Sequence, residues 1–197
     1  SSSVRLNADP TSRVTVFFTV TFSKSVTGVD ATDFSLTNGG SLTGSSVVSV
    51  SGTGSTRTVG VTTGTGDGTV QLNVLNNGSI KDAVNNVLSG PTFTAGQFYT
   101  VDKSFPTVLS SVRANTNPTN RTSVFFTVTF SEAVTGVDMA DFSLTTSGVT
   151  GASITSATGT GATRTVGVNT GTGNGTILLN VADNDTILDI AGSQLGG

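Results

Sequence analysis

Short runs of alternating apolar and polar residues recur along the chain, and each run is bounded by Gly, Asn, Asp or Pro. Within residues 14–22 the apolar side chains occupy every second position, namely Val14, Val16, Phe18, Val20 and Phe22. A period of two places these side chains on one face of a β-strand, so we expect all five to face a core. Helical periodicity is absent elsewhere, and at most residues 80–87 hold a helical turn.

The first half of the chain contains seven such runs. We predict strands at residues 4–7, 14–22, 33–37, 47–51, 57–62, 69–75 and 92–101. Gly-rich segments between the runs are typical of tight turns. Seven short strands in about 100 residues, with turns at regular spacing, predict an all-β fold built as a two-sheet antiparallel sandwich.

The pattern is written twice. VFFTVTFSKSVTGVDATDFSL at residues 16–36 returns as VFFTVTFSEAVTGVDMADFSL at residues 124–144, an offset of 108 positions. TRTVGVTTGTGDGT at residues 56–69 returns as TRTVGVNTGTGNGT at residues 163–176, an offset of 107. Self-similarity at this period indicates two copies of one domain.

The two copies differ at their ends. After Gly90 the first copy continues with PTFTAGQFYTVDKSFP, whereas the second reaches Gly197 at the matching position. We therefore expect a complete sandwich at 1–102, a linker at 103–108 and a second sandwich at 109–197. The second sandwich is expected to lack the strand equivalent to 91–102, which leaves a sheet edge unpaired.

Composition narrows the chemistry. The 197 residues carry 9 basic and 12 acidic side chains, a net charge of −3 without a basic cluster, so we expect no nucleic-acid partner. No apolar run approaches 18 residues, so we expect no membrane insertion. There is no Cys and no His, which removes the usual general base and the commonest ligand of transition metals. A bound metal is therefore expected to be calcium, held by oxygen, and we expect no enzyme because Ser and Thr have no placed base.

A set of acidic residues in the second copy is a candidate calcium site. The loops expected at the pole of the second sandwich, together with the linker that enters it, supply the set Asp102, Glu132, Asp183, Asp185 and Asp189. Calcium would relieve the repulsion among these carboxylates and use their oxygens as ligands. The simpler alternative is a solvated acidic loop in which Asp189 only forms a turn.

The first copy has lost most of this set. Lys24 stands at the position of Glu132, while Asn76 and Gly78 replace the two loop aspartates; Asp82 alone matches, at the position of Asp189. We therefore expect the calcium ion to stiffen the junction between the copies and to have no equivalent in the first copy.

Other repeated residues have structural interpretations. Asp30 and Asp33, which return as Asp138 and Asp141, are expected to cap turns, with a supplementary metal role as the alternative. The paired Arg57 and Arg164 are expected on exposed sheet positions. A glycan site lacks support, because the chain has no Trp and a single Tyr.

Three segments resemble bacterial immunoglobulin-like repeats: FSEAVTGVDMADFSL at 130–144, DTILDIAGSQLGG at 185–197 and YTVDKSFPTV at 99–108. The resemblance covers nearly the whole chain. It implies two tandem immunoglobulin-like antiparallel β-sandwiches and a location outside the cell, on a bacterial surface. Repeats of this kind are strung together in adhesins and filaments.

The functional hypothesis combines these features. We expect a structural subunit of an extracellular fibre, pilus or adhesin stalk that binds copies of itself or neighbouring repeats, head to tail. A β-strand from another subunit would complete the second sandwich. The alternatives are a glycan- or protein-binding adhesin or accessory module, and a fragment of a longer repeat array.

Overall fold

The computed structural model describes residues 1–182 and 184–196, and it is all-β apart from two short 3-10 turns. The chain divides into two compact units, Ser1–Ser104 and Phe105–Gly197, each with its own hydrophobic core. No helix in the described part of the chain is long and apolar enough to cross a membrane.

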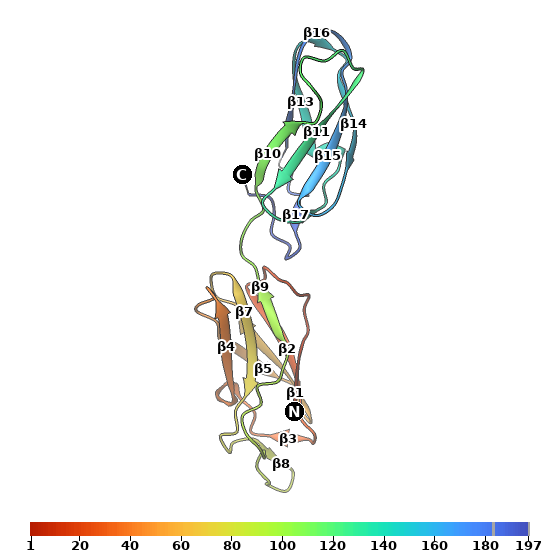
Figure 1. Cartoon of the computed structure of the whole chain (residues 1–197). Helices are drawn as coiled ribbons and strands as arrows, with labels where there is room; N and C mark the ends of the chain where they lie inside the picture. The colour runs from red at the N-terminus through yellow and green to blue at the C-terminus, as the bar shows by residue number, and fades with distance from the viewer. Residues whose placement is uncertain (183, 197) are drawn as a thin grey trace. The chain divides into compact units, whose positions relative to one another are not determined.

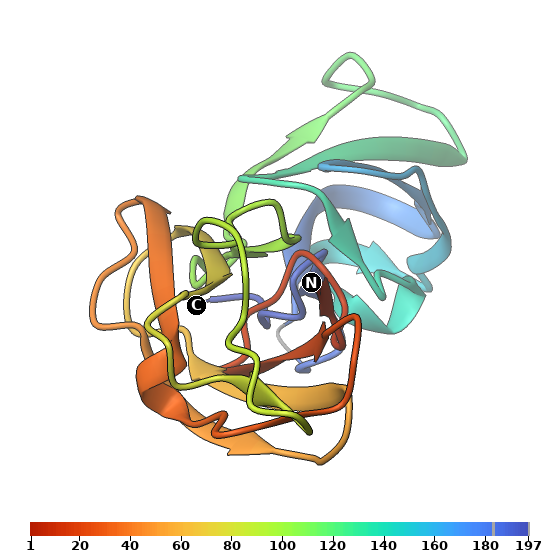
Figure 2. The same ribbon diagram turned by 90° about the horizontal axis from the view of Figure 1, so that it is seen from below.

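The first unit is a sandwich of two antiparallel sheets (Figure 1). One sheet has the order β1-β2-β6-β5, with bounds Ser2–Arg5, Thr15–Thr21, Thr56–Thr62 and Ser46–Ser51. The other has the order β4-β7-β9, with bounds Phe34–Gly40, Gly68–Val74 and Phe98–Val101. Two short strands, β3 (Val26–Thr27) and β8 (Lys81–Asp82), pair at one end. Seen from below, the strands of this unit surround its core (Figure 2).

The core of the first unit follows the alternation in β2. Val16, Phe18 and Val20 are completely buried, as the period of two requires. Val14 is 72% exposed because it precedes the strand, so the expectation that it faces the core is wrong. From the opposite sheet, β9 contributes Tyr99, which is fully buried and packs edge-on against Phe18 at 5.0 Å between ring centroids.

The second unit repeats the first sheet and shortens the other. The sheet β10-β11-β15-β14 has bounds Val108–Arg113, Ser123–Phe130, Thr163–Asn169 and Ser153–Thr158. Opposite it, β13 (Phe142–Thr150) pairs with β16 (Thr172–Val181), and β12 (Val134–Thr135) pairs with β17 (Leu188–Asp189). Among the described residues, β16 has no second strand in the position that β9 takes beside β7. The prediction of two antiparallel sandwiches, the second one strand short, is confirmed.

Local departures from the sequence expectations have physical reasons. The last strand of the first unit is regular only from Phe98, since Phe93 reaches β7 through a single bridge to Val74. The segment 80–87 forms β8 and not a helical turn, because Asp82 folds the following chain back through its own backbone and side chain.

The turn capping expected from the repeated aspartates is present. The 3-10 turns Ala31–Asp33 and Met139–Asp141 each carry a reciprocal capping box, made by Asp30 with Asp33 and by Asp138 with Asp141. Asp33 and Asp141 are fully buried, and each also accepts a hydrogen bond from a hydroxyl, that of Ser79 and that of Thr186.

The repeated arginines are buried, so the expectation of exposed positions is wrong. Arg57 is 6% exposed and Arg164 is 5% exposed. Each guanidinium donates to three backbone carbonyls, including Val26 O at 2.7 Å in the first unit and Val134 O at 2.6 Å in the second. These bonds tie the short strands β3 and β12 to the neighbouring turns. Burial lowers the pKa of Arg164 from its ordinary value.

Candidate functional site

Asp189 in β17 is the central residue of the acidic set in the second unit. Its side chain is almost fully buried, with 3% exposed. Oδ1 accepts the Ser193 N–H at 2.7 Å, and the Asp189 N–H donates to the Ser193 carbonyl at 2.9 Å. Within the described residues, Oδ2 is buried and accepts no hydrogen bond. A buried carboxylate oxygen without a donor is costly, and a cation is one way to compensate it.

Glu132 lies beside Asp189. It follows β11 by two residues, and one of its carboxylate oxygens lies within 4.8 Å of a carboxylate oxygen of Asp189. The preceding residue, Ser131, is bonded to the chain that enters this unit: its N–H donates to Thr107 O at 2.9 Å, and its Oγ accepts the Thr107 N–H at 2.9 Å. The entry segment is therefore held next to the two carboxylates.

Three predicted ligands remain, namely Asp102, Asp183 and Asp185. Asp185 is exposed, has a φ of 65°, and is not a member of the close group among the described residues. Asp183 lies outside the described residues. Asp102 belongs to the first unit, directly after β9, where its N–H donates to Thr11 O at 3.1 Å and its Oδ1 accepts the Ser104 N–H at 3.1 Å.

At the matching position of the first unit, the carboxylate of Asp82 lies beside a lysine side chain. Asp82 Oδ2 lies 3.4 Å from the Lys24 ammonium and accepts the Asn86 amide N–H at 3.1 Å, while Oδ1 accepts the N–H groups of Val84 and Asn86. These bonds, the Asn86 side chain first, hold the pKa of Asp82 below its ordinary value. Both carboxylate oxygens of Asp82 thus have protein partners, whereas among the described residues Asp189 Oδ2 has none.

The unpaired edge of β16 is the second candidate site. In the first unit β9 pairs with β7 from Gln71↔Phe98 to Gly68↔Val101, and it leaves Val70 and Val74 completely buried. The matching Ile177 and Val181 of β16 are only half-buried. Leu178, which replaces Gln71, is 58% exposed. An apolar strand with an open hydrogen-bonding edge is suited to receive another strand.

A hydroxyl socket beside β9 was not foreseen from the sequence. Tyr99 Oη accepts the N–H groups of Leu6 at 2.9 Å and Asn7 at 2.7 Å, and it donates to Phe17 O at 2.7 Å. The signal available in the sequence was the single Tyr of the chain together with the Asn that recurs as Asn7 and Asn115.

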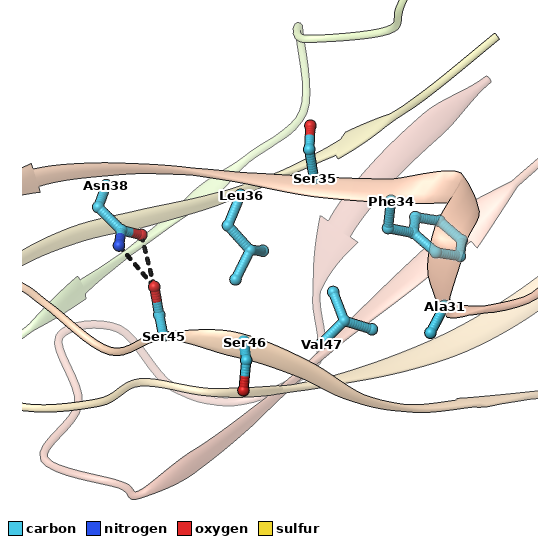
Figure 3. A pocket seen from close by; sticks show the side chains of 8 residues that line it. All are labelled: Ala31, Phe34, Ser35, Leu36, Asn38, Ser45, Ser46 and Val47. Atoms are coloured by element: carbon cyan, nitrogen blue, oxygen red, sulfur yellow. Dashed lines mark hydrogen bonds between the residues drawn. The ribbon is translucent and has the colours of Figure 1, made fainter. Parts of the chain in front are cut away.

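An open groove of about 430 Å³ runs along the other side of the first unit, between the edge strands β4 and β5 (Figure 3). Phe34, Leu36 and Val47 form its apolar floor, and Asn38 is bonded twice to Ser45 at one end. Because these polar groups are already paired with each other, the groove presents no chemistry that selects a ligand.

Comparisons with known proteins add a single structural likeness. No protein-family model matches the sequence, and no curated protein matches it significantly. Among solved structures, the chain is similar to FdeC, described as a broadly conserved Escherichia coli adhesin, with 18% identity and a TM-score of 0.38. The match covers 98% of this chain and 62% of the FdeC chain. This level of likeness carries no argument about function.

Proposed function

We propose that the chain is a structural module of an extracellular bacterial surface fibre, joined to its neighbours head to tail. One observation carries the proposal: in the part of the chain that the structure describes, β7 has two partner strands and the matching β16 has one. A strand supplied by a neighbouring repeat would complete the second sandwich and link the two modules. The resemblance to bacterial immunoglobulin-like repeats supports the surface location.

Strand addition has a clear physical gain. The added strand would satisfy the outward N–H and C=O groups of β16, and it would cover Ile177, Leu178 and Val181. Each buried apolar side chain contributes roughly 1.5–3 kcal/mol on burial. Because the acceptor sandwich is already folded, the loss of conformational entropy on binding falls mainly on the donated segment.

Hydrogen exchange measured by mass spectrometry tests the assembly. In the dilute chain alone the amides of β16 should exchange faster than those of β7, and the difference should disappear on assembly with a neighbouring repeat that supplies the strand. Assembly that leaves β16 as fast as in the monomer would overturn strand addition. A buried, slowly exchanging β16 in the monomer would do the same.

The second part of the proposal is a calcium ion held by Glu132 and Asp189. The buried, unpartnered Oδ2 of Asp189 and the nearby Glu132 carboxylate support it, since Ca²⁺ prefers six to eight oxygen ligands and neutralises such a pair. Asp102, Asp183 and Asp185 are the proposed further ligands. Asp102 stands only five residues before Thr107, whose backbone is bonded to Ser131.

Calorimetry tests the calcium site. Isothermal titration should give one ion per chain, and at a hundredfold excess over Kd the second unit should gain about 2.7 kcal/mol of stability relative to EGTA. The first unit should show no change. Identical melting curves in calcium and EGTA would contradict the site, as would a response confined to the first unit.

A further inference from the structure

The socket that holds the Tyr99 hydroxyl is repeated in the second unit. In the first unit, Leu6 N–H donates to Phe17 O at 2.9 Å and Phe17 N–H donates to Asn7 Oδ1 at 2.9 Å. In the second unit the corresponding Ala114 N–H donates to Phe125 O at 2.8 Å, and Phe125 N–H donates to Asn115 Oδ1 at 2.7 Å. The backbone geometry that receives a phenol is therefore built twice, whereas the sequence contains one tyrosine.

Further groups that bind β9 along the same edge have counterparts in the sequence of the second copy. In the first unit Gln97 Oε1 accepts the Arg5 N–H at 2.9 Å, and Asp9 Oδ1 accepts the Thr100 N–H at 2.6 Å. The matching residues are Arg113 and Asn117, and both are exposed. Asn117 keeps a side-chain carbonyl that accepts a strand N–H as the Asp9 carboxylate does.

We propose that the strand completing the second unit carries a tyrosine whose hydroxyl enters the socket formed by Asn115 N–H and Phe125 O. The inference rests on the proposed strand addition and specifies its partner. The register of β9 on β7 places this tyrosine opposite Ile177 and the residue before it opposite Leu178. A glutamine two positions before the tyrosine would accept the Arg113 N–H.

The donor residue that faces Leu178 can also be specified. In the first unit the partners are Gln71 and Phe98, and Gln71 uses its amide to hold the carbonyls of Thr94 and Gly96. Leu178 has no amide and is 58% exposed, so it gains by facing an aromatic or aliphatic side chain. The donor pattern is thus Gln, then an apolar residue, then Tyr.

The donor is a segment other than β9 of the first unit. The chain's own β9 has this pattern, but Tyr99 is completely buried in the first unit, and releasing it would open that core. A segment of a neighbouring repeat that matches β9 and is not already part of a complete sandwich is the partner that the socket fits.

A labelled synthetic peptide of residues 91–103 is the probe, and the full chain is the receptor. Fluorescence anisotropy should show one peptide bound per chain. A peptide with Tyr99→Phe should bind about 5- to 10-fold more weakly, because it leaves the socket N–H and C=O groups without their partner. A peptide with Tyr99→Ala should lose at least 100-fold, because it also loses the buried ring.

Receptor variants locate the site. Leu178→Lys lies at an exposed position and should weaken binding roughly 10-fold, while the matched Gln71→Lys in the complete unit should leave it unchanged. Appending residues 91–104 after Gly197 continues the second copy in the register of the first. This variant should fill the site from within the chain and abolish peptide binding.

Each outcome separates the two proposals. Equal binding of the Tyr and Phe peptides would overturn the tyrosine socket and leave strand addition standing. Binding that survives the appended strand would place the peptide elsewhere and overturn the site. If no peptide binds while the chain still assembles with a protected β16, the tyrosine proposal alone fails.

Discussion

The two units are an internal comparison, in which two related copies of one sequence pattern are folded with and without one strand. Both keep the four-stranded sheet, the capping boxes and the buried arginine. They differ where β9 covers the first unit: Val70 and Val74 are completely buried, whereas Ile177 and Val181 are half-buried. The four-stranded sheet therefore forms without the last strand, whose contribution is to seal one edge and one hydroxyl socket.

Removing the Tyr99 side chain is the strongest way to make the units alike. Tyr99→Ala should destabilise the first unit by about 4 kcal/mol, since a fully buried aromatic ring and three hydrogen bonds are lost. Differential scanning calorimetry should show the melting transition of the first unit falling toward that of the second. Tyr99→Phe, which loses only the hydroxyl bonds, should cost about 1–2 kcal/mol. A cost confined to the second transition would break the comparison.

Exchanging the acidic pair for the arrangement of the first unit tests the second difference. Glu132→Lys with Ser193→Asn recreates the ammonium and amide that satisfy Asp82. The variant should lose its response to calcium, which for the parent is about 2.7 kcal/mol at a hundredfold excess over Kd. In EGTA it should be more stable than the parent by about 1 kcal/mol, because Asp189 gains partners. A calcium response that persists would contradict ligation by Glu132.

Lowering the pH should destabilise the first unit by protonating two carboxylates, those of Asp67 and Asp82. The Lys103 N–H and then the Ser104 hydroxyl lower the pKa of Asp67, and Asn86 lowers that of Asp82. Because the folded pKa lies below the ordinary 3.8, the stabilisation is fully present above about pH 4 and is lost as pH falls through the folded pKa. The melting temperature of the first unit, followed from pH 5 to pH 2, should fall less steeply in an Asp67→Asn, Asp82→Asn variant. Equal slopes would contradict the assignment.

The paired arginines Arg5 and Arg113 give the smallest and sharpest test. Arg5 donates to Asp9 at 2.7 Å and to Phe98 O at 2.7 Å, whereas Arg113 is exposed. Arg5→Ala should cost the first unit about 0.5–1 kcal/mol, and Arg113→Ala should have an effect near zero on the second. Urea unfolding measures both. Equal costs would indicate that β9 does not engage this arginine.

The sequence was sufficient for the repeat, the strand pattern and the missing strand, because each follows from periodicity and self-alignment. It did not predict that Arg57 and Arg164 are buried, because a lone charged residue on a strand is usually exposed. Only the folded structure shows the backbone carbonyls that accept hydrogen bonds from the buried guanidinium groups. The short strands β3 and β8 were not predicted either, because a strand of two residues is too short to show an alternating pattern.

The candidate sites, too, were only partly predictable from the sequence. Counting carboxylates named Glu132 and Asp189, and a carboxylate oxygen of each lies within 4.8 Å of the other. The count could not reveal that Asp189 Oδ2 is buried without a partner, which depends on Ser193 standing where the first copy has Asn86. The tyrosine socket was not predicted, because it is made mainly of backbone atoms, and the single Tyr and the recurring Asn were its signals in the sequence.

The place of β9 along the chain has a consequence for biosynthesis. If β16 accepts a strand like β9, as proposed, a nascent chain contains two competing acceptors for one segment. Translation runs at about 5–20 residues per second, and Thr172 is added roughly 4 to 14 seconds after Val101. Small β-rich domains fold within milliseconds to seconds. The order of synthesis therefore lets β9 pair with β7 before the rival edge has left the ribosome.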